Sequence, residues 1–156
     1  MKVREGLVYH IRDEYFDIVS DCDVKLKPCH GRSYPAYCCH RDFDNAMIWM
    51  IPMSKNVEKY CAVYEREMFR YNHCYSIYIG EYDMQKTAFL IQELFPVYKK
   101  HILYEHTRKG RAVPVQASMR SGIRHCFDNM MDLSSRGFKC IFPDIERIMH
   151  ILACTK

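Results

Sequence analysis

Alternating apolar and polar positions predict strands in the first part of the chain. Residues Val3 to Ile11 alternate in this way, and residues 12–19 then take up the spacing of a helix. Tyr34 to His40 and Met47 to Met53 follow as two further strands, and the residues between them include the Asp and Asn that favour a turn. The pattern therefore predicts a strand, a short helix and a β-hairpin, in that order.

The middle of the chain predicts a second pair of strands. Cys74 to Ile79 and Thr87 to Ile91 are rich in aromatic and β-branched residues, and a polar turn separates them. This arrangement favours an antiparallel sheet. Residues 57–69 fit neither the helical nor the strand period, so they stay open between a helix and an irregular segment.

Two helices are predicted in the last third. Residues 116–136 carry apolar side chains at three- and four-residue steps, and Gly137 stands where a left-handed cap would end the helix. Residues 139–142 are predicted as a last strand, after which Asp144 is placed to cap a terminal helix. Together the elements predict an α+β fold, an antiparallel sheet with packed helices, as a single domain over residues 1–156.

Composition narrows the class of protein without choosing a function. The 156 residues are 49% hydrophobic, which suits one domain with its own core. No run approaches the roughly 20 apolar residues of a membrane helix, and the N-terminus lacks a signal-peptide pattern. We therefore expect an unprocessed cytoplasmic protein with no membrane association. The net charge of +4 permits a polyanionic partner but does not require one.

Nine cysteines are the most unusual feature of the composition. Their odd number and irregular spacing predict reduced thiols, most of them in the core. A structural zinc site built around Cys29, Cys38 and His40 is an alternative, but there is no C-x₂-C pair. Adjacent Cys38 and Cys39 on a strand also point to opposite faces of the sheet, so both could not reach one ion. We therefore expect no metal and no cofactor.

A hydroxyl and two ammonium groups gather after the second strand of the hairpin. Pro52 is predicted to end the pairing of that strand, which would expose Ser54, Lys55, Lys59 and Tyr60 at a sheet edge. Lysines and a hydroxyl can hold a phosphodiester by neutralising and hydrogen-bonding its oxygens. The alternative is an ordinary solvated turn. The common motifs of serine hydrolases, zinc proteases and nucleotide-binding proteins do not occur.

Aromatic and basic residues are interleaved in two further segments, residues 32–37 and 98–111. Bases stacked on aromatic rings, with lysine or arginine on the phosphates, are how proteins hold single-stranded RNA. The alternative is that most of the tyrosines are sheet residues with one solvated end. The candidate RNA contacts are Arg32, Tyr37, Tyr60, Lys99, Lys100, His106, Arg108, Lys109 and Arg111.

Several stretches together resemble the toxins of bacterial type III toxin-antitoxin systems. The likeness lies in residues 2–9, 32–37, 51–60 and 142–144, and its most specific part runs from Pro52 to Tyr60. The chain is similar to the ToxN, CptN and TenpN toxins, and closest to the CptN or TenpN branch.

The resemblance implies a metal-independent endoribonuclease on a twisted antiparallel sheet like that of the Kid and MazF toxins. Such a toxin cuts cellular mRNA, arrests bacterial growth and takes part in phage defence. A small repeated RNA that folds as a pseudoknot inhibits it, and the toxin processes this RNA and stays bound to it in a closed protein–RNA hetero-oligomer. Cleavage by the RNA's own 2′-hydroxyl leaves a 2′,3′-cyclic phosphate and a 5′-hydroxyl.

The family's catalytic hydroxyl falls on Ser54 in this sequence. Its lysine is either Lys55 or Lys59, and we favour Lys59 because it lies in the best-matching stretch. His40 is expected near the same sheet edge as a candidate acid or base. A non-catalytic RNA-binding module is the alternative function; it would keep the aromatic and basic surface without depending on Ser54 and the lysines.

Overall fold

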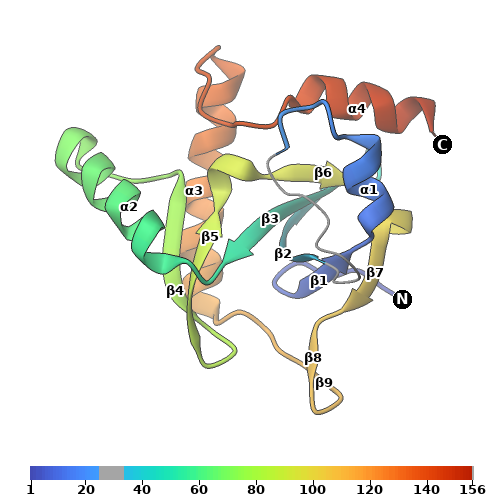
Figure 1. The fold of residues 1–156 in the computed structure, drawn as a ribbon, viewed down its shortest axis with the longest axis horizontal. Helices are drawn as coiled ribbons and strands as arrows, with labels where there is room; N and C mark the ends of the chain where they lie inside the picture. The colour runs from blue at the N-terminus through green and yellow to red at the C-terminus, as the bar shows by residue number, and fades with distance from the viewer. Residues whose placement is uncertain (25–33, 156) are drawn as a thin grey trace.

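A curved antiparallel sheet with helices on both of its faces forms the framework of the protein (Figure 1). The computed structural model describes residues 1–24 and 34–155. Its elements are β1 (Val8–Ile11), α1 (Asp13–Ile18), β2 (Tyr34–Arg41), β3 (Ile48–Ser54), α2 (Val57–Tyr71), β4 (Ile77–Tyr82), β5 (Gln85–Leu90), η1 (Ile91–Glu93), β6 (Phe95–Val97), η2 (Lys99–His101), β7 (Ile102–Glu105), β8 (Thr107–Arg108), β9 (Arg111–Ala112), α3 (Ala117–Ser135) and α4 (Ile145–Cys154). The predicted α+β class with an antiparallel sheet is confirmed.

Six strands follow one another across the sheet in the order β4-β5-β3-β2-β1-β7, and β6 pairs with β3 as well. The predicted hairpin is β2–β3, whose register places Ala36 opposite Pro52 and His40 opposite Trp49. Its turn is closed by side chains, because Asp42 Oδ1 accepts the N–H of Asp44 at 3.0 Å. Aspartate suits this position because its side chain can bond the backbone two residues ahead.

The expectation that Pro52 ends the strand pairing of β3 is wrong. On one side β3 pairs with β6 through residues 48–50 and then with β5 through Met53 and Ser54. Pro52 lies in the interval between these two partners, where a missing backbone N–H costs least. The strand therefore continues to Ser54, which lies opposite Ala88 of β5.

Alternation along the strands builds two cores, one on each face of the sheet. Cys38 belongs to the core formed with α1 and α4, whereas Cys39 belongs to the core formed with α3. The predicted opposite orientation of these two cysteines is confirmed. The eight cysteines of the described part of the chain are free thiols, and four of them are buried, namely Cys22, Cys38, Cys39 and Cys126.

The two helices predicted in the last third are confirmed as α3 and α4. Gly137 ends α3 with φ +91, and the N–H of Phe138 reaches back to the carbonyl of Leu133 at 3.1 Å, as in a Schellman cap. Asp144 caps α4 by accepting the N–H of Arg147 at 3.2 Å. None of the helices within residues 1–24 and 34–155 has the length and apolarity needed to cross a membrane.

The strand predicted at residues 139–142 is wrong. This segment forms no ladder with the sheet, although the N–H of Phe142 donates to the carbonyl of Gln92 at 2.8 Å. Cys140 and Ile141 pack instead against the α3 core as part of the connection to α4. The aromatic and β-branched composition of the segment therefore serves core packing rather than strand pairing.

Candidate active site

A pocket of about 260 Å³ opens on the face of the sheet that α3 covers, at the end where β3, β5 and β1 meet their loops. We call it the Ser54 pocket. Its lining combines a hydroxyl, an ammonium group, two imidazoles and a carboxylate. The residues that line it are Val8, His10, Pro35, Met53, Ser54, Lys55, Tyr82, Asp83, Gln85, Thr87 and His106.

Two histidines and an aspartate form a hydrogen-bonded chain along one wall of the Ser54 pocket. Nε2 of His106 lies 3.2 Å from Oδ2 of Asp83, and Nδ1 of His106 lies 2.9 Å from Nε2 of His10. Strand pairing places the imidazoles together, because β1 pairs with β7 and the backbone N–H of His106 donates to the carbonyl of Val8 at 2.8 Å. The rings of His10 and His106 stack with centroids 5.2 Å apart.

Asp83 occupies the tight turn between β4 and β5. It and Met84 have φ values of 48 and 65, the left-handed pair that a two-residue hairpin turn requires. The hydrogen bond from His106 and the guanidinium of Arg108, whose Nη1 is 3.2 Å from Oδ1, lower the pKa of the Asp83 carboxyl. At neutral pH Asp83 is therefore ionised and can only accept hydrogen bonds.

The charge on Asp83 determines how the neutral imidazoles are protonated. Because the carboxylate cannot donate, Nε2 of His106 must carry the hydrogen that joins them. Nδ1 of neutral His106 is then the acceptor, and Nε2–H of His10 is the donor between the two rings. The aspartate thus orients the imidazole pair and stabilises a positive charge on it, as carboxylates do beside catalytic histidines.

Ser54 and Lys55 line the same pocket as the imidazole pair. The hydroxyl oxygen of Ser54 accepts the N–H of Asn56 at 3.1 Å, so its own hydrogen stays available for another acceptor. Lys55 is exposed and forms no ion pair with any residue whose structure is described. The Ser54 pocket therefore combines a hydrogen-bond donor and a positive charge with the chain formed by the histidines and Asp83.

Lys59 and Tyr60 lie outside the Ser54 pocket, on the first turn of α2. The ammonium group of Lys59 stands 5.3 Å from the ring centroid of Tyr60. Tyr60 is half-buried and packs against the small core of Ile77, Ala88 and Leu90. Of the two candidate lysines, the pocket thus contains Lys55, and the preference for Lys59 has no support in the geometry.

His40 does not lie near Ser54, so its expected position is wrong. It pairs with Trp49, five residues before Ser54 on β3, and this separation corresponds to about 16 Å along a strand. Its Nδ1 lies 3.3 Å from Oε1 of Glu5 instead. The β2–β3 register places Tyr34 rather than His40 at the end of the hairpin where Ser54 lies.

Two of the expected RNA contacts, Arg32 and Tyr37, gain no support from the structure. Arg32, together with the zinc candidate Cys29, lies outside the described residues. Tyr37 is 3% exposed and packs edge to face on Phe89 with ring centroids 5.8 Å apart, so it offers no free face for a stacked base.

Within residues 1–24 and 34–155, no group of three or more His, Cys, Asp or Glu side chains is arranged to hold a metal ion.

The remaining basic candidates lie at opposite ends of β7. Lys99 and Lys100 precede the strand and are exposed, and the ammonium group of Lys100 donates to the carbonyl of Thr155 at 2.7 Å. His106 follows the strand and leads into the β8–β9 hairpin, which projects from the sheet (Figure 1). Three exposed basic side chains are concentrated on this hairpin beside the Ser54 pocket, namely Arg108, Lys109 and Arg111.

Sequence reasoning missed His10 and Asp83. His10 stands in an alternating strand and Asp83 in an ordinary hairpin turn, and neither belongs to a motif. The available signal was weak: His10 is the one residue of β1 that is not buried, and a polar residue there is normal for a half-buried strand.

Comparison with known proteins places the fold. No family model and no curated protein matches this sequence. Among solved structures, the chain is similar to AbiQ, a lactococcal anti-phage endoribonuclease of a type III toxin-antitoxin system, with a TM-score of 0.72, 11% identity and 96% of each chain covered.

A second similar structure comes from a bacterial antiviral system that a processed non-coding RNA regulates. Here the TM-score is 0.65 and the identity 9%, with 92% of this chain and 95% of the other covered. At this level of identity the likeness concerns the fold. The chain therefore has the fold of AbiQ over almost its whole length, which agrees with the resemblance to type III toxins found in its sequence.

Proposed function

We propose that this chain is a type III toxin that cleaves RNA without a metal ion and is inhibited by a small repeated pseudoknot RNA. One observation carries the proposal: the Ser54 pocket combines a hydroxyl, an ammonium group and a carboxylate-oriented imidazole pair, on a fold that it shares with an anti-phage endoribonuclease. These groups supply the proton transfer and charge stabilisation that RNA cleavage needs.

The proposed reaction is attack by a 2′-oxygen on the neighbouring phosphorus. The bond between O2′ and phosphorus forms while the bond between phosphorus and O5′ breaks, which gives a 2′,3′-cyclic phosphate and a 5′-hydroxyl. The His10–His106 pair takes up the proton from the 2′-hydroxyl and returns a proton to O5′. Lys55 and the hydroxyl of Ser54 stabilise the charge that develops on the two other phosphate oxygens.

The inhibitory RNA follows from the family resemblance of the sequence, and the basic β8–β9 hairpin offers a surface for it. Phosphate contacts from exposed Arg and Lys supply most of the affinity of proteins for RNA. In the proposed complex the repeat RNA is a product of this same pocket and stays bound, so cellular mRNA is excluded. The complex is a closed assembly of protein and RNA in the cytoplasm.

Growth of bacteria that express the chain tests this function. We expect the wild-type chain to arrest growth, and co-expression of the repeat RNA encoded beside it to relieve the arrest. His106→Ala removes one imidazole of the pair and should abolish toxicity, whereas His150→Ala removes an exposed histidine of α4 and should not.

The level of soluble protein, followed on immunoblots, controls for expression. Normal growth with abundant soluble wild-type chain would contradict the proposal. If His106→Ala arrests growth as strongly as the wild type does, the result would instead favour a non-catalytic RNA-binding module.

A further inference from the structure

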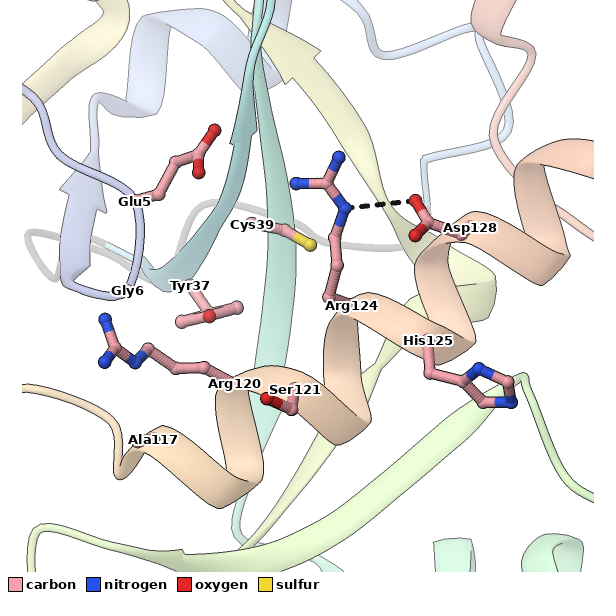
Figure 2. A pocket seen from close by; sticks show the side chains of 10 residues that line it. All are labelled: Glu5, Gly6, Tyr37, Cys39, Ala117, Arg120, Ser121, Arg124, His125 and Asp128. Atoms are coloured by element: carbon pink, nitrogen blue, oxygen red, sulfur yellow. Dashed lines mark hydrogen bonds and ion pairs between the residues drawn. The ribbon is translucent and has the colours of Figure 1, made fainter.

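A second pocket, with a volume of about 550 Å³, lies between β2 and α3 (Figure 2). We call it the α3 pocket. Its residues come from the loop before β1, from β2 and from the first three turns of α3. They are Glu5, Gly6, Tyr37, Cys39, Ala117, Arg120, Ser121, Arg124, His125 and Asp128.

The α3 pocket adjoins the Ser54 pocket on the same face of the sheet. Val8 lines the Ser54 pocket, and its partner across the β1–β2 ladder, Tyr37, lines the α3 pocket. Along β2, Pro35 lines the first pocket and Tyr37 the second. Residues two apart on a strand share a face and lie roughly 7 Å from each other. A ligand strand that leaves one pocket can therefore enter the other.

Two arginines project from successive turns of α3 into this pocket, while His125 points away from them (Figure 2). Arg120 lies across Gly6, where a methyl group would stand 2.8 Å from its Cδ, so the absence of a side chain at Gly6 makes room for it. Arg120 has no hydrogen bond or ion pair with any described residue. Arg124 donates through its Nε to Asp128 at 3.0 Å, and its guanidinium lies 5.6 Å from the ring centroid of Phe127. Most of the guanidinium N–H groups are thus available to a ligand.

The hydroxyl of Tyr37 adds a third donor at the floor of the pocket. The side chain is 3% exposed and lines the pocket, and within residues 1–24 and 34–155 its hydroxyl forms no hydrogen bond. The hydroxyl can therefore donate to a ligand in the pocket. Burial raises the pKa of Tyr37, which keeps the hydroxyl protonated and able to donate.

The two carboxylates of the pocket already have partners. Oε1 of Glu5 accepts the backbone N–H of Arg41 at 2.8 Å, and Asp128 accepts the N–H of Arg124. One oxygen of each carboxylate is thus occupied, and the two guanidinium groups supply unused cationic donors. Such a set matches an anion with several oxygens, because a guanidinium fork binds phosphate through two parallel hydrogen bonds.

We propose that the α3 pocket binds a phosphodiester of the RNA strand whose neighbouring segment occupies the Ser54 pocket. This inference rests on the proposed function and adds a second binding site to it. Arg120 and Arg124 hold the phosphate from the helix side, and the hydroxyl of Tyr37 donates to it from the sheet side. Phosphate contacts fix the register of a nucleic acid. The α3 pocket therefore sets which bond of the strand lies beside Ser54.

Binding of a single-stranded 2′-O-methyl RNA of eight nucleotides tests this site, because such an RNA lacks the attacking hydroxyl and stays intact. We expect Arg120→Gln/Arg124→Gln to weaken binding by about tenfold or more and to lower the salt slope by about 1.4, the value for two lost phosphate contacts on a single strand. Arg136→Gln is the control, since Arg136 caps the C-terminal end of α3 and pairs with Asp132 outside both pockets. It should leave affinity and slope unchanged.

Tyr37→Phe is a second variant that keeps the buried ring and removes only the hydroxyl. It should weaken the same RNA by a smaller factor and leave thermal unfolding unchanged. If the wild type binds this RNA and the arginine double variant binds with equal affinity and slope, the inference is overturned while the proposed function stands. If the double variant loses affinity for inorganic phosphate but keeps its affinity for the RNA, the pocket is a site for free phosphate and the inference is again overturned. If the wild type does not bind the RNA at all, both the inference and the proposed function are contradicted.

Discussion

Ser54 and Lys55 are neighbours in the sequence and would point to opposite faces if both lay in a strand. β3 ends at Ser54, and the chain bends at Lys55, where the N–H of Val57 reaches back to the Lys55 carbonyl at 2.9 Å. Met53 packs against the α3 core, so alternation places Lys55, two residues later, on the same face, and Ser54 is the residue that departs from the alternation. Both residues line one pocket, and Lys59, on the first turn of α2, lies outside it.

Substitution of each of these residues distinguishes the roles of the two lysines. We expect Ser54→Ala and Lys55→Ala each to lower the cleavage rate by roughly 10²-fold or more, because each removes a donor to the transition state. Lys59→Ala removes an exposed ammonium group outside the pocket and should change the rate only a few-fold. Rates on one RNA under single-turnover conditions provide the measurement. Full activity of Lys55→Ala together with inactivity of Lys59→Ala would reverse the assignment.

His101 is a buried histidine outside both pockets. It is 5% exposed, and its Nδ1 accepts the N–H of Tyr98 at 3.0 Å. Burial, and to a lesser extent the charge of Lys100, lower its pKa to about 4. Protonation at Nδ1 would set two N–H groups against each other, so the folded protein keeps this imidazole neutral.

This lowered pKa predicts a stability change with pH. Between pH 6.5 and pH 4 the unfolded chain binds a proton at His101 and the folded chain does not, so the free energy of unfolding falls as the pH falls through this range. The contribution is about 3 kcal/mol at most. We expect His101→Gln to lack this pH-dependent fall in the free energy of unfolding, as measured by urea unfolding at several pH values. Parallel stability curves for the wild type and the variant would contradict the assignment.

The β8–β9 hairpin is an element that the chain uses for charge rather than for packing. Lys109 and Gly110 form its turn with φ values of 52 and 77, and its residues are exposed. It contributes no residue to the three hydrophobic cores. Its basic side chains can therefore be replaced with little effect on the fold.

Replacing two of these side chains tests the hairpin as an RNA contact. We expect Lys109→Gln/Arg111→Gln to weaken the binding of single-stranded RNA of any sequence and to lower the salt slope by about 1.4. Arg136→Gln/Lys139→Gln removes the same charge after the C-terminal end of α3 and serves as the control. Equal affinity and slope for the two double variants would show that the hairpin makes no phosphate contact.

Elements with one buried face were predictable from the sequence, and the exceptions have physical causes. Helices α3 and α4 repeat their apolar residues as one buried face requires, whereas β3 is buried on both faces and shows as a short continuous apolar run. Helix α2 has 15 residues and none is fully buried: half-buried Tyr60 and Val63 pack against the small core, while the exposed apolar side chain of Phe69 obscures the helical period. Residues 139–142 have the composition of a strand but find no partner strand, and pairing cannot be read from composition.

At the scale of the whole molecule, the sheet curves until its two ends meet. Asp83 follows β4, the first strand in the sheet order, and His106 follows β7, the last. The hydrogen bond between their side chains, 3.2 Å long, joins these ends. The candidate site therefore exists only because the sheet closes on this side, where His10 of β1 bonds to His106.

This closure explains which site residues could be predicted. Ser54 and Lys55 adjoin each other in a stretch that resembles the type III toxins, so the sequence alone marked them. His10, Asp83 and His106 stand far apart along the chain and meet through strand order and register. No local pattern encodes that meeting. His106 was expected only as an RNA contact, and its bond to Asp83 connects it to the proposed proton-transfer chemistry.

Cleavage of a defined RNA in the presence of EDTA is the most direct test of the central claim, that the groups of the Ser54 pocket cut RNA through its own 2′-hydroxyl. We expect full activity with the chelator, products that end in a 2′,3′-cyclic phosphate and a 5′-hydroxyl, and no cleavage when hydrogen replaces the 2′-hydroxyl at the cut site. Activity that vanishes with EDTA and returns with a divalent ion, or cleavage at a 2′-deoxy position, would contradict the account.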